Sequence, residues 1–158
     1  MIDGVKIKKL IICQDIPDTN EPQEKSGFLM EVLRDDENLL KKFGQTTFTV
    51  AYPGTIKAFH WHKKQDDLWF FARGKALVVL YDLRENSPTK GETQTILADA
   101  NEPQLILIPI GIAHGYKALG NEPVHLFYHT TESYNANEPD EERIPYNDSK
   151  INFDWNNN

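Results

Sequence analysis

Short apolar segments separated by turn residues run along most of this chain. The segments are rich in Val, Ile, Phe, Tyr and Trp, the residue types that favour strands, and Gly, Pro or Asn lie in the gaps between them. Many short strands at even spacing are typical of a sandwich or barrel and disfavour alternating β and α units. The pattern predicts strands near residues 5–13, 45–52, 56–61, 67–72, 76–83, 93–98, 104–109 and 123–130.

Residues 31–43 depart from this alternation and predict a short helix. Lysines lie at the end of the segment, where they complement the helix dipole, and Gly44 follows as a stop signal. The apolar residues that recur at roughly helical spacing are Val32, Leu39, Leu40 and Phe43. Farther along, residues 132–148 are polar and predict an ordered surface loop. No change in composition marks a domain boundary, so residues 1–158 are predicted to form one domain.

The charge balance narrows the expected partners. The chain carries 24 acidic and 17 basic residues and a formal charge of −7, which argues against a nucleic-acid or membrane surface. A phosphorylated ligand stays compatible, because a few basic residues in one pocket can override the overall sign. The chain contains one cysteine, Cys13, and the apolar segment before it is too short for a signal peptide or a membrane span. A cytoplasmic protein without an internal disulfide is therefore expected.

Two motifs with characteristic spacing contain histidines. The first comprises Gly54, His60, His62, Asp67 and Gly74, and the second comprises Pro109, Gly111 and His114. Successive side chains of a strand point to opposite faces, so His60 and His62 are expected on the same face. The spacing is typical of a cupin jelly roll, in which such histidines enter one cavity. The expected fold class is therefore all-β, a double-stranded β-helix with one or two short helices.

The histidine motifs allow two kinds of chemistry. In the first, a divalent transition metal binds, because neutral imidazoles with one carboxylate suit Fe(II), Mn, Ni or Zn. Its ligands would be His60, His62, Asp67 and His114. In the second, no metal is needed. A neutral imidazole oriented by a carboxylate removes a proton next to a ketone, and a tyrosine on the opposite face returns one. The ligand set alone does not decide between them.

Residues outside the histidine motifs favour the second chemistry. The segments concerned are Gly27–Glu31, Gln45, Asp82–Gly91, Ile108–Tyr116, Tyr134 and Phe153–Trp155. In them the chain resembles the dTDP-4-dehydrorhamnose 3,5-epimerase family, and the string Asp-Leu-Arg-x-x-Ser-Pro-Thr-x-Gly is quite specific. The resemblance implies a jelly-roll homodimer that requires no cofactor. It also implies epimerisation of a nucleotide-diphosphate sugar at the carbons flanking a C4 ketone, in the biosynthesis of deoxysugars and cell-surface polysaccharides.

The resemblance also implies roles for individual residues. His60 corresponds to the catalytic base, Asp148 to the carboxylate that pairs with it, and Tyr134 to the general acid. Contacts to the substrate, its nucleotide and its diphosphate are implied for Phe28, Glu31, Gln45, Lys57, His62 and His114. Judged without the resemblance, Tyr134 is interpreted as a loop residue and Asp148 as a turn residue. In the same way, Arg84 fits a buried ion pair, and residues 87–89 fit a turn with local hydrogen bonds.

Four positions depart from the family pattern. Ser26 replaces an arginine, which removes one contact to the diphosphate. Lys57 replaces an arginine and lacks its bidentate fork, and His62 replaces a glutamine. The segment around Asp67 lacks the lysine that the family carries after its catalytic histidine; Lys63, Lys64, a protonated His62 or a metal could supply that positive charge. A divergent member is therefore expected. Three alternatives stay open: a nucleotide-sugar 3,4-ketoisomerase, a metal-dependent cupin enzyme, and a sugar-binding protein without activity.

Overall fold

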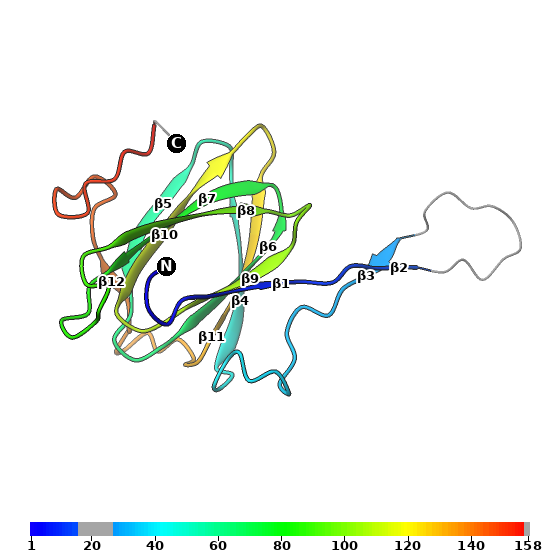
Figure 1. Ribbon diagram of the computed structural model, residues 1–158, viewed down its shortest axis with the longest axis horizontal. Coiled ribbons are helices and arrows are strands. Elements are labelled where there is room, and N and C mark those ends of the chain that lie inside the picture. The colour runs from blue at the N-terminus through cyan, green and yellow to red at the C-terminus, as the bar shows by residue number, and fades with distance from the viewer. Residues whose placement is uncertain (16–26, 157–158) are drawn as a thin grey trace, which may run out of the picture.

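Two antiparallel sheets that pack against each other form the body of the protein, as the computed structural model shows (Figure 1). The structure describes residues 1–15 and 27–156, so Ser26 lies outside the described residues. The first sheet has the order β1 (Lys6–Lys9), β9 (Gln104–Ile108), β6 (Asp67–Arg73), β11 (Val124–Thr130) and β4 (Gln45–Ala51). The second has the order β12 (Glu142–Arg143), β5 (Ile56–Trp61), β10 (Ile112–Leu119), β7 (Lys75–Asp82) and β8 (Thr93–Asp99). The all-β jelly roll expected from the sequence is confirmed.

The core between the sheets is built from alternate side chains of both. Val78 and Leu80 of β7 belong to the same buried cluster as Ile106 of β9 and Leu126 of β11. Burying each such side chain contributes roughly 1.5–3 kcal/mol. The intervening residues of β7 belong to a second cluster on the outer face, which contains Phe59, Leu77, Val79, Tyr81, Ala113, Ile151 and Trp155. Strand β7 is thus buried on both faces, which explains its uninterrupted apolar sequence.

The helix expected over residues 31–43 is wrong, because the segment consists of turns. Its apolar residues Val32, Leu39 and Leu40 pack against Leu68, Phe70, Leu105 and Leu107 on the outer face of the first sheet. Asn38 has a φ of +50°, in the left-handed region that interrupts a right-handed helix. The spacing that resembled a helix therefore reflects contacts with the sheet. The described residues form no helix, and so none that is long and apolar enough to cross a membrane.

Strand β10 is missing from the strands predicted by the apolar pattern, although it is central in the second sheet. Glycines at 111, 115 and 120 flank and interrupt it, and glycine in sequence indicates a break. A Cβ at Gly115 would lie 2.3 Å from the Cβ of Ala58, so this glycine lets β10 approach β5 closely. The resulting register places His114 opposite His60. The missed strand therefore brings the two histidine motifs together.

The predicted strand over residues 5–13 is divided into β1 and β2 (Cys13–Gln14). Strand β2 pairs with β3 (Phe28–Leu29) in a small separate sheet that projects beyond the two main sheets in Figure 1. The polar segment 132–148 is mostly loop, as predicted, but it contains β12, which pairs with β5. This pairing holds the loop beside the histidines.

Candidate active site

A cavity of about 730 Å³ lies between the two sheets. Strands β4, β5, β6, β10 and β11 line it, and the connection between β5 and β6 and the segment over residues 132–143 contribute the rest of its wall. Its size suits a small organic ligand, since such cavities span roughly 300–1,000 Å³. The cavity brings together most of the residues predicted from the sequence, namely Gln45, Lys57, His60, His62, Asp67, His114 and Tyr134.

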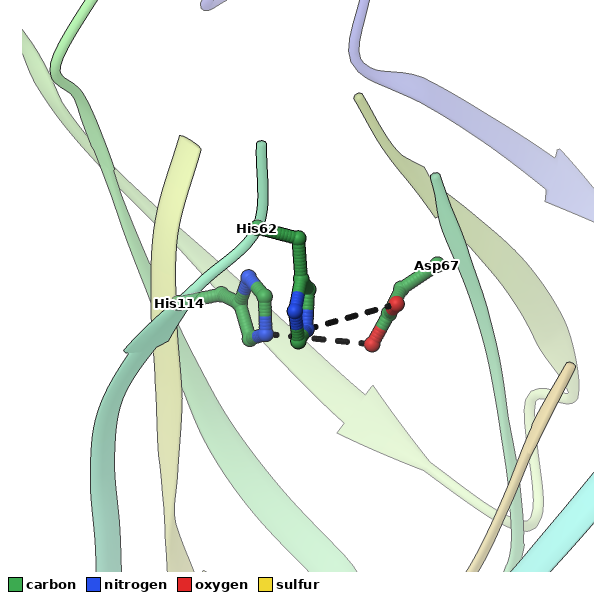
Figure 2. Close-up of side chains that lie close together, drawn as sticks. All are labelled: His62, Asp67 and His114. Carbon is green, nitrogen blue, oxygen red and sulfur yellow. Dashed lines mark ion pairs between the residues drawn. The ribbon is translucent and has the colours of Figure 1, made fainter. Parts of the chain in front are cut away.

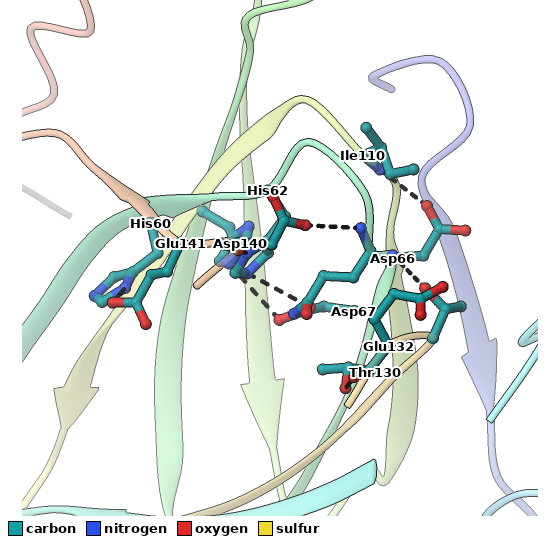
Figure 3. Close-up of polar contacts among 12 residues, drawn as sticks. His60, His62, Asp66, Asp67, Ile110, Thr130, Glu132, Asp140 and Glu141 are labelled. Carbon is teal, nitrogen blue, oxygen red and sulfur yellow. Dashed lines mark hydrogen bonds and ion pairs between the residues drawn. The ribbon is translucent and has the colours of Figure 1, made fainter. Parts of the chain in front are cut away.

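His60 is paired with a carboxylate at the cavity wall. Its Nδ1 lies 2.9 Å from Oε1 of Glu141 (Figure 3). A carboxylate can only accept, so the proton is on Nδ1, and Nε2 carries a lone pair when the ring is neutral. Burial alone would raise the pKa of Glu141, but hydrogen bonds from Arg143 and His60 outweigh it and hold the pKa below its ordinary value. Glu141 is therefore ionised and orients His60 as a proton acceptor.

Asp148, which the resemblance implied as the partner of His60, takes another position. Its Oδ1 accepts hydrogen bonds from the backbone N–H groups of Lys150 and Ile151, at 2.9 and 3.2 Å. This is the arrangement of a turn, in which a short acidic side chain caps the following backbone. Asp148 is also absent from the cavity lining. The structure thus corrects the expected pair: Glu141 contacts His60. The sequence offered no signal to single out Glu141 among the acidic residues 138–142.

A second cluster lies deeper in the cavity and is formed by His62, Asp67 and His114 (Figure 2). Nε2 of His62 is 3.6 Å from Oδ1 of Asp67, and Nε2 of His114 is 3.8 Å from Oδ2 of the same carboxylate. All three side chains are nearly inaccessible to solvent. Burial lowers the pKa of His114 to about 4, so this ring is neutral at neutral pH. The cluster is compact and largely buried, and it lines the same cavity as His60.

The four-residue metal set predicted from the sequence is therefore brought together only in part. Among the residues that the structure describes, the group close enough to share an ion contains His62, Asp67 and His114 but not His60. Strand β5 ends at Trp61, so His62 lies just beyond the strand, although it lines the same cavity as His60. His60 turns its Nδ1 to Glu141, whereas His62 turns its Nδ1 to the backbone of Asp140. The two neighbouring histidines thus belong to different clusters.

Three further predicted residues line the cavity from its edges. The ammonium of Lys57 donates to Thr49 Oγ1 at 2.7 Å and to the Val50 carbonyl at 2.9 Å, and burial lowers its pKa. Oε1 of Gln45 accepts from the backbone N–H of Tyr134 at 2.7 Å. This bond fixes the backbone of Tyr134, whose side chain is largely exposed and lines the cavity.

Tyr116 is a lining residue that the sequence did not single out as a contact. It is buried, and its hydroxyl has no hydrogen-bond partner among the described residues. Burial raises the pKa of Tyr116 to about 12, so the hydroxyl keeps its proton. Because an unpaired buried hydroxyl is costly, this group is suited to bond a polar atom of a ligand. Only its position in β10, two residues after His114, could have indicated the role.

Phe28 and Glu31, two residues expected to contact substrate, lie outside this cavity. Phe28 belongs to β3 in the small projecting sheet and is exposed. The carboxylate of Glu31 pairs with Arg34 at 3.0 Å. Within one chain, Phe28 and Glu31 therefore lie away from the histidines of the cavity.

The segment after β7 confirms a structural interpretation of its motif. Asp82 is fully buried and accepts hydrogen bonds from Arg84, Ser87 and Thr89. Burial alone would raise the pKa of Asp82, but these hydrogen bonds outweigh it and hold the pKa below its ordinary value of 3.8. Arg84 forms the expected ion pair, and Ser87 and Thr89 form a turn with local hydrogen bonds. Neither hydroxyl is placed as a nucleophile.

A family model described as dTDP-4-dehydrorhamnose 3,5-epimerase matches residues 13–158. The chain belongs to this family. The resemblance inferred from its sequence motifs is thereby confirmed, and so is the enzyme class, because epimerases are isomerases.

Curated relatives of this epimerase-family protein match it almost end to end. It is 54% identical to the spore coat polysaccharide biosynthesis protein SpsL of Bacillus subtilis, over 99% of this chain and 97% of that protein. It is 38% identical to the probable low-salt glycan biosynthesis epimerase Agl13 of Haloferax volcanii, over 90% of this chain and 92% of that protein.

Solved structures of the family have the same fold. A dTDP sugar isomerase from Desulfovibrio desulfuricans aligns with a TM-score of 0.84 and 26% identity, covering 98% of this chain and 92% of that one. An epimerase from Legionella pneumophila, solved in complex with dTDP-4-keto-L-rhamnose, aligns with a TM-score of 0.81 and 25% identity, covering 98% of this chain and 80% of that one.

Proposed function

We propose that this protein epimerises a dTDP-4-keto-6-deoxyhexose or a closely related nucleotide sugar at the carbons that flank the C4 ketone, in polysaccharide biosynthesis. The observation that carries the proposal is the His60–Glu141 pair in a cavity large enough for a sugar. The names of the relatives support it: one serves spore coat polysaccharide synthesis, another glycan synthesis, and a third is solved with a keto sugar.

The proposed reaction consists of two proton transfers. Nε2 of His60 takes the proton from a carbon next to the ketone, the C–H electron pair forms a carbon–carbon double bond, and negative charge moves to the ketone oxygen. Glu141 stabilises the imidazolium that results, because it is an ionised carboxylate 2.9 Å from Nδ1. Tyr134 then gives a proton to the opposite face of the same carbon, which inverts it. No electrons are gained or lost, so the reaction calls for no redox cofactor.

The remaining lining residues hold the substrate in this proposal. Lys57 supplies positive charge for the diphosphate, and Gln45 both positions Tyr134 and contacts the nucleotide. Tyr116 donates its unpaired hydroxyl to the sugar. We place the reaction in the cytoplasm, in keeping with the single cysteine of the chain.

The proposal includes a homodimer. Phe28 and Glu31 lie outside the cavity of their own chain, and β2 and β3 project beyond the main sheets. In a dimer, this projecting pair of strands would place Phe28 and Glu31 at the cavity of the second copy, where they would contact the nucleotide.

Deuterium uptake from solvent tests the reaction. In D₂O, dTDP-4-keto-6-deoxyglucose incubated with the enzyme should exchange the hydrogens at C3, C5 or both, as followed by NMR. His60→Asn should slow exchange by roughly 10²–10⁴-fold, the usual contribution of general base catalysis. His125→Gln, a histidine outside the cavity lining, should leave the rate unchanged.

Retention of both hydrogens by the folded wild-type protein, with dTDP- and GDP-linked keto sugars alike, would contradict an epimerase. The same spectra locate the carbonyl of the product. A carbonyl moved from C4 to C3 would instead identify a 3,4-ketoisomerase.

A further inference from the structure

The deeper cluster in the cavity has an unusual arrangement of hydrogen-bond acceptors. Nδ1 of His62 bonds the backbone carbonyl of Asp140, and Nδ1 of His114 bonds the backbone carbonyl of Ile112 at 3.0 Å. A carbonyl only accepts, so both rings hold a proton on Nδ1. In a neutral ring Nε2 is then a bare lone pair. Both Nε2 atoms point at the carboxylate of Asp67, as Figure 2 shows.

These three acceptors repel one another unless a positive charge lies among them. The carboxylate of Asp67 receives two neutral donors, Gln65 Nε2 at 2.9 Å and Trp69 Nε1 at 3.2 Å. These bonds fix its orientation but leave its charge uncompensated. The three described cations that line the cavity bond other groups: Lys57 bonds Thr49, Lys64 bonds Glu138, and Arg143 bonds Glu141. The cluster is therefore a buried site with an unmatched negative charge and two lone pairs.

We propose that His62, Asp67 and His114 bind one divalent first-row transition-metal ion, through the two Nε2 atoms and the Asp67 carboxylate. The donor set favours Fe²⁺, Zn²⁺, Mn²⁺ or Co²⁺ over Mg²⁺ and Ca²⁺, which prefer sites made of oxygen atoms alone. The backbone carbonyls on Nδ1 and the donors on Asp67 form the supporting hydrogen bonds that orient ligands in metal sites.

The geometry needs little adjustment to accept such an ion. The candidate ligand atoms all lie within 4.8 Å of one another. Ions with ligand distances of about 2.0–2.2 Å place neighbouring ligand atoms about 3–3.5 Å apart. The separations from Asp67 are larger, 3.6 Å from His62 to Oδ1 and 3.8 Å from His114 to Oδ2, so the side chains would rotate inward to close the site. The three side chains line the cavity, so an ion held there would be accessible to a ligand in it, and His60 stays outside the ligand set.

This site also deepens the proposed function, and that part of the inference rests on it. Removing a proton next to the ketone places negative charge on the ketone oxygen. A divalent ion at this cluster supplies positive charge inside a buried cavity, where such charge is most effective. His60 and Glu141 hold the proton that is removed, so the metal and the base are separate groups.

Binding is tested directly on protein that has been treated with a chelator and dialysed. Titration with Co²⁺, followed by calorimetry and by visible absorption, should show one ion per chain and ligand-field bands. His62→Gln and Asp67→Asn should each weaken the binding by at least about 100-fold, in the range seen when metal sites are disrupted. His125→Gln should bind like the wild type, and near-identical circular dichroism of all four proteins shows that they are folded.

The outcomes separate the site from the reaction. Absence of binding at millimolar Co²⁺, or equally tight binding by His62→Gln and Asp67→Asn, would overturn the metal site whatever the enzyme does with keto sugars. Deuterium exchange that is equally fast in metal-free and reloaded protein would overturn the catalytic role of the metal and leave the epimerase standing. Stoichiometric binding without exchange would support the site and contradict the proposed reaction.

Discussion

At the scale of single residues, three histidines hold their proton on the same ring nitrogen, Nδ1, but donate it to different kinds of acceptor. His60 donates from Nδ1 to the carboxylate of Glu141, whereas His62 and His114 donate to backbone carbonyls. A carboxylate stabilises an imidazolium by its charge, so it favours a ring that accepts a proton. A carbonyl fixes the tautomer without adding charge, which favours a neutral ligand. In our proposals, the acceptor bonded to Nδ1 therefore distinguishes the base, His60, from the two metal ligands, His62 and His114.

Glu141→Gln should lower the rate of deuterium exchange by about 100-fold or more, because the imidazolium of His60 loses its counter-charge and its preferred tautomer. Asp148→Asn is the matched comparison, since it makes the same chemical change in the residue that the family resemblance implied. We expect a clearly smaller effect there, because Asp148 bonds backbone N–H groups. NMR exchange rates of both variants decide the point, and a larger loss in Asp148→Asn would reverse the assignment.

Tyr134→Phe should separate proton removal from inversion. His60 can still take a proton and return a deuteron to the same face, so label should enter the substrate. Delivery to the opposite face should fall by about 100-fold, the scale of a lost general acid. NMR measures both quantities in one sample, label from peak loss and inversion from coupling constants. Loss of both inversion and exchange would show that Tyr134 is also needed for proton removal and does not act as the general acid alone.

At the scale of elements, ends and connections of strands carry more of the site than strand interiors. His62 follows the end of β5, and Glu141 precedes β12. The turn between β7 and β8 is held by Asp82, which bonds Arg84, Ser87 and Thr89. Strand interiors supply the register that places these ends side by side, as when β10 pairs with β5.

Asp82→Asn should destabilise the protein by about 2–3 kcal/mol at neutral pH, because removing one partner of a buried ion pair leaves the other charge unmatched. The expected loss is smaller than for a fully buried pair because Arg84 is partly exposed to solvent. The folded pKa of Asp82 lies below 3.8, so the unfolded chain binds this proton first on acidification. The difference from the wild type should be constant above about pH 5 and shrink below about pH 4. Urea unfolding at several pH values measures it.

Glu85→Gln serves as the control for this turn. Glu85 is exposed and pairs with Lys90, so its loss should leave the free energy of unfolding nearly unchanged. Equal losses in the two variants would show that the buried network around Asp82 has no special contribution.

At the scale of the whole molecule, the two sheets gather residues that are far apart in sequence around one cavity. His60 and Glu141 are separated by 81 positions, and the first lies in a strand of the second sheet. The cavity nevertheless lacks Phe28 and Glu31, which lie in or next to the projecting strands. This distribution is the basis for the proposed dimer, in which each protomer completes the nucleotide site of its partner.

Light scattering should give a mass twice that of the 18.2 kDa chain. In the dimer, Phe28→Ala should raise KM for the nucleotide sugar with little change in kcat, because a contact to the nucleotide is lost while the reacting groups stay in place. Phe43→Ala is the matched control, since Phe43 is similarly exposed and has no expected contact with substrate. A monomer with an unchanged KM for Phe28→Ala would contradict the proposed arrangement.

Sequence patterns alone predicted most strands, the jelly roll and several of the residues that line the cavity. Alternation and motif spacing are local properties, so short segments such as 56–62 and 109–114 reveal them. Prediction from the sequence failed where the local pattern and the tertiary packing disagree. The apolar spacing of residues 31–43 reflects a sheet surface, and the glycines of β10 allow a close approach between strands.

The hydrogen-bond partners of the histidines depend on contacts that form only in the folded chain. The sequence contains several carboxylates that could face His60, and nothing local distinguishes Glu141 from Asp148. The choice depends on the pairing of β12 with β5, a contact between segments some 80 residues apart. The same holds for the division of His60 and His62 between two clusters, because a ring nitrogen has no assigned role until its hydrogen-bond partner is in place.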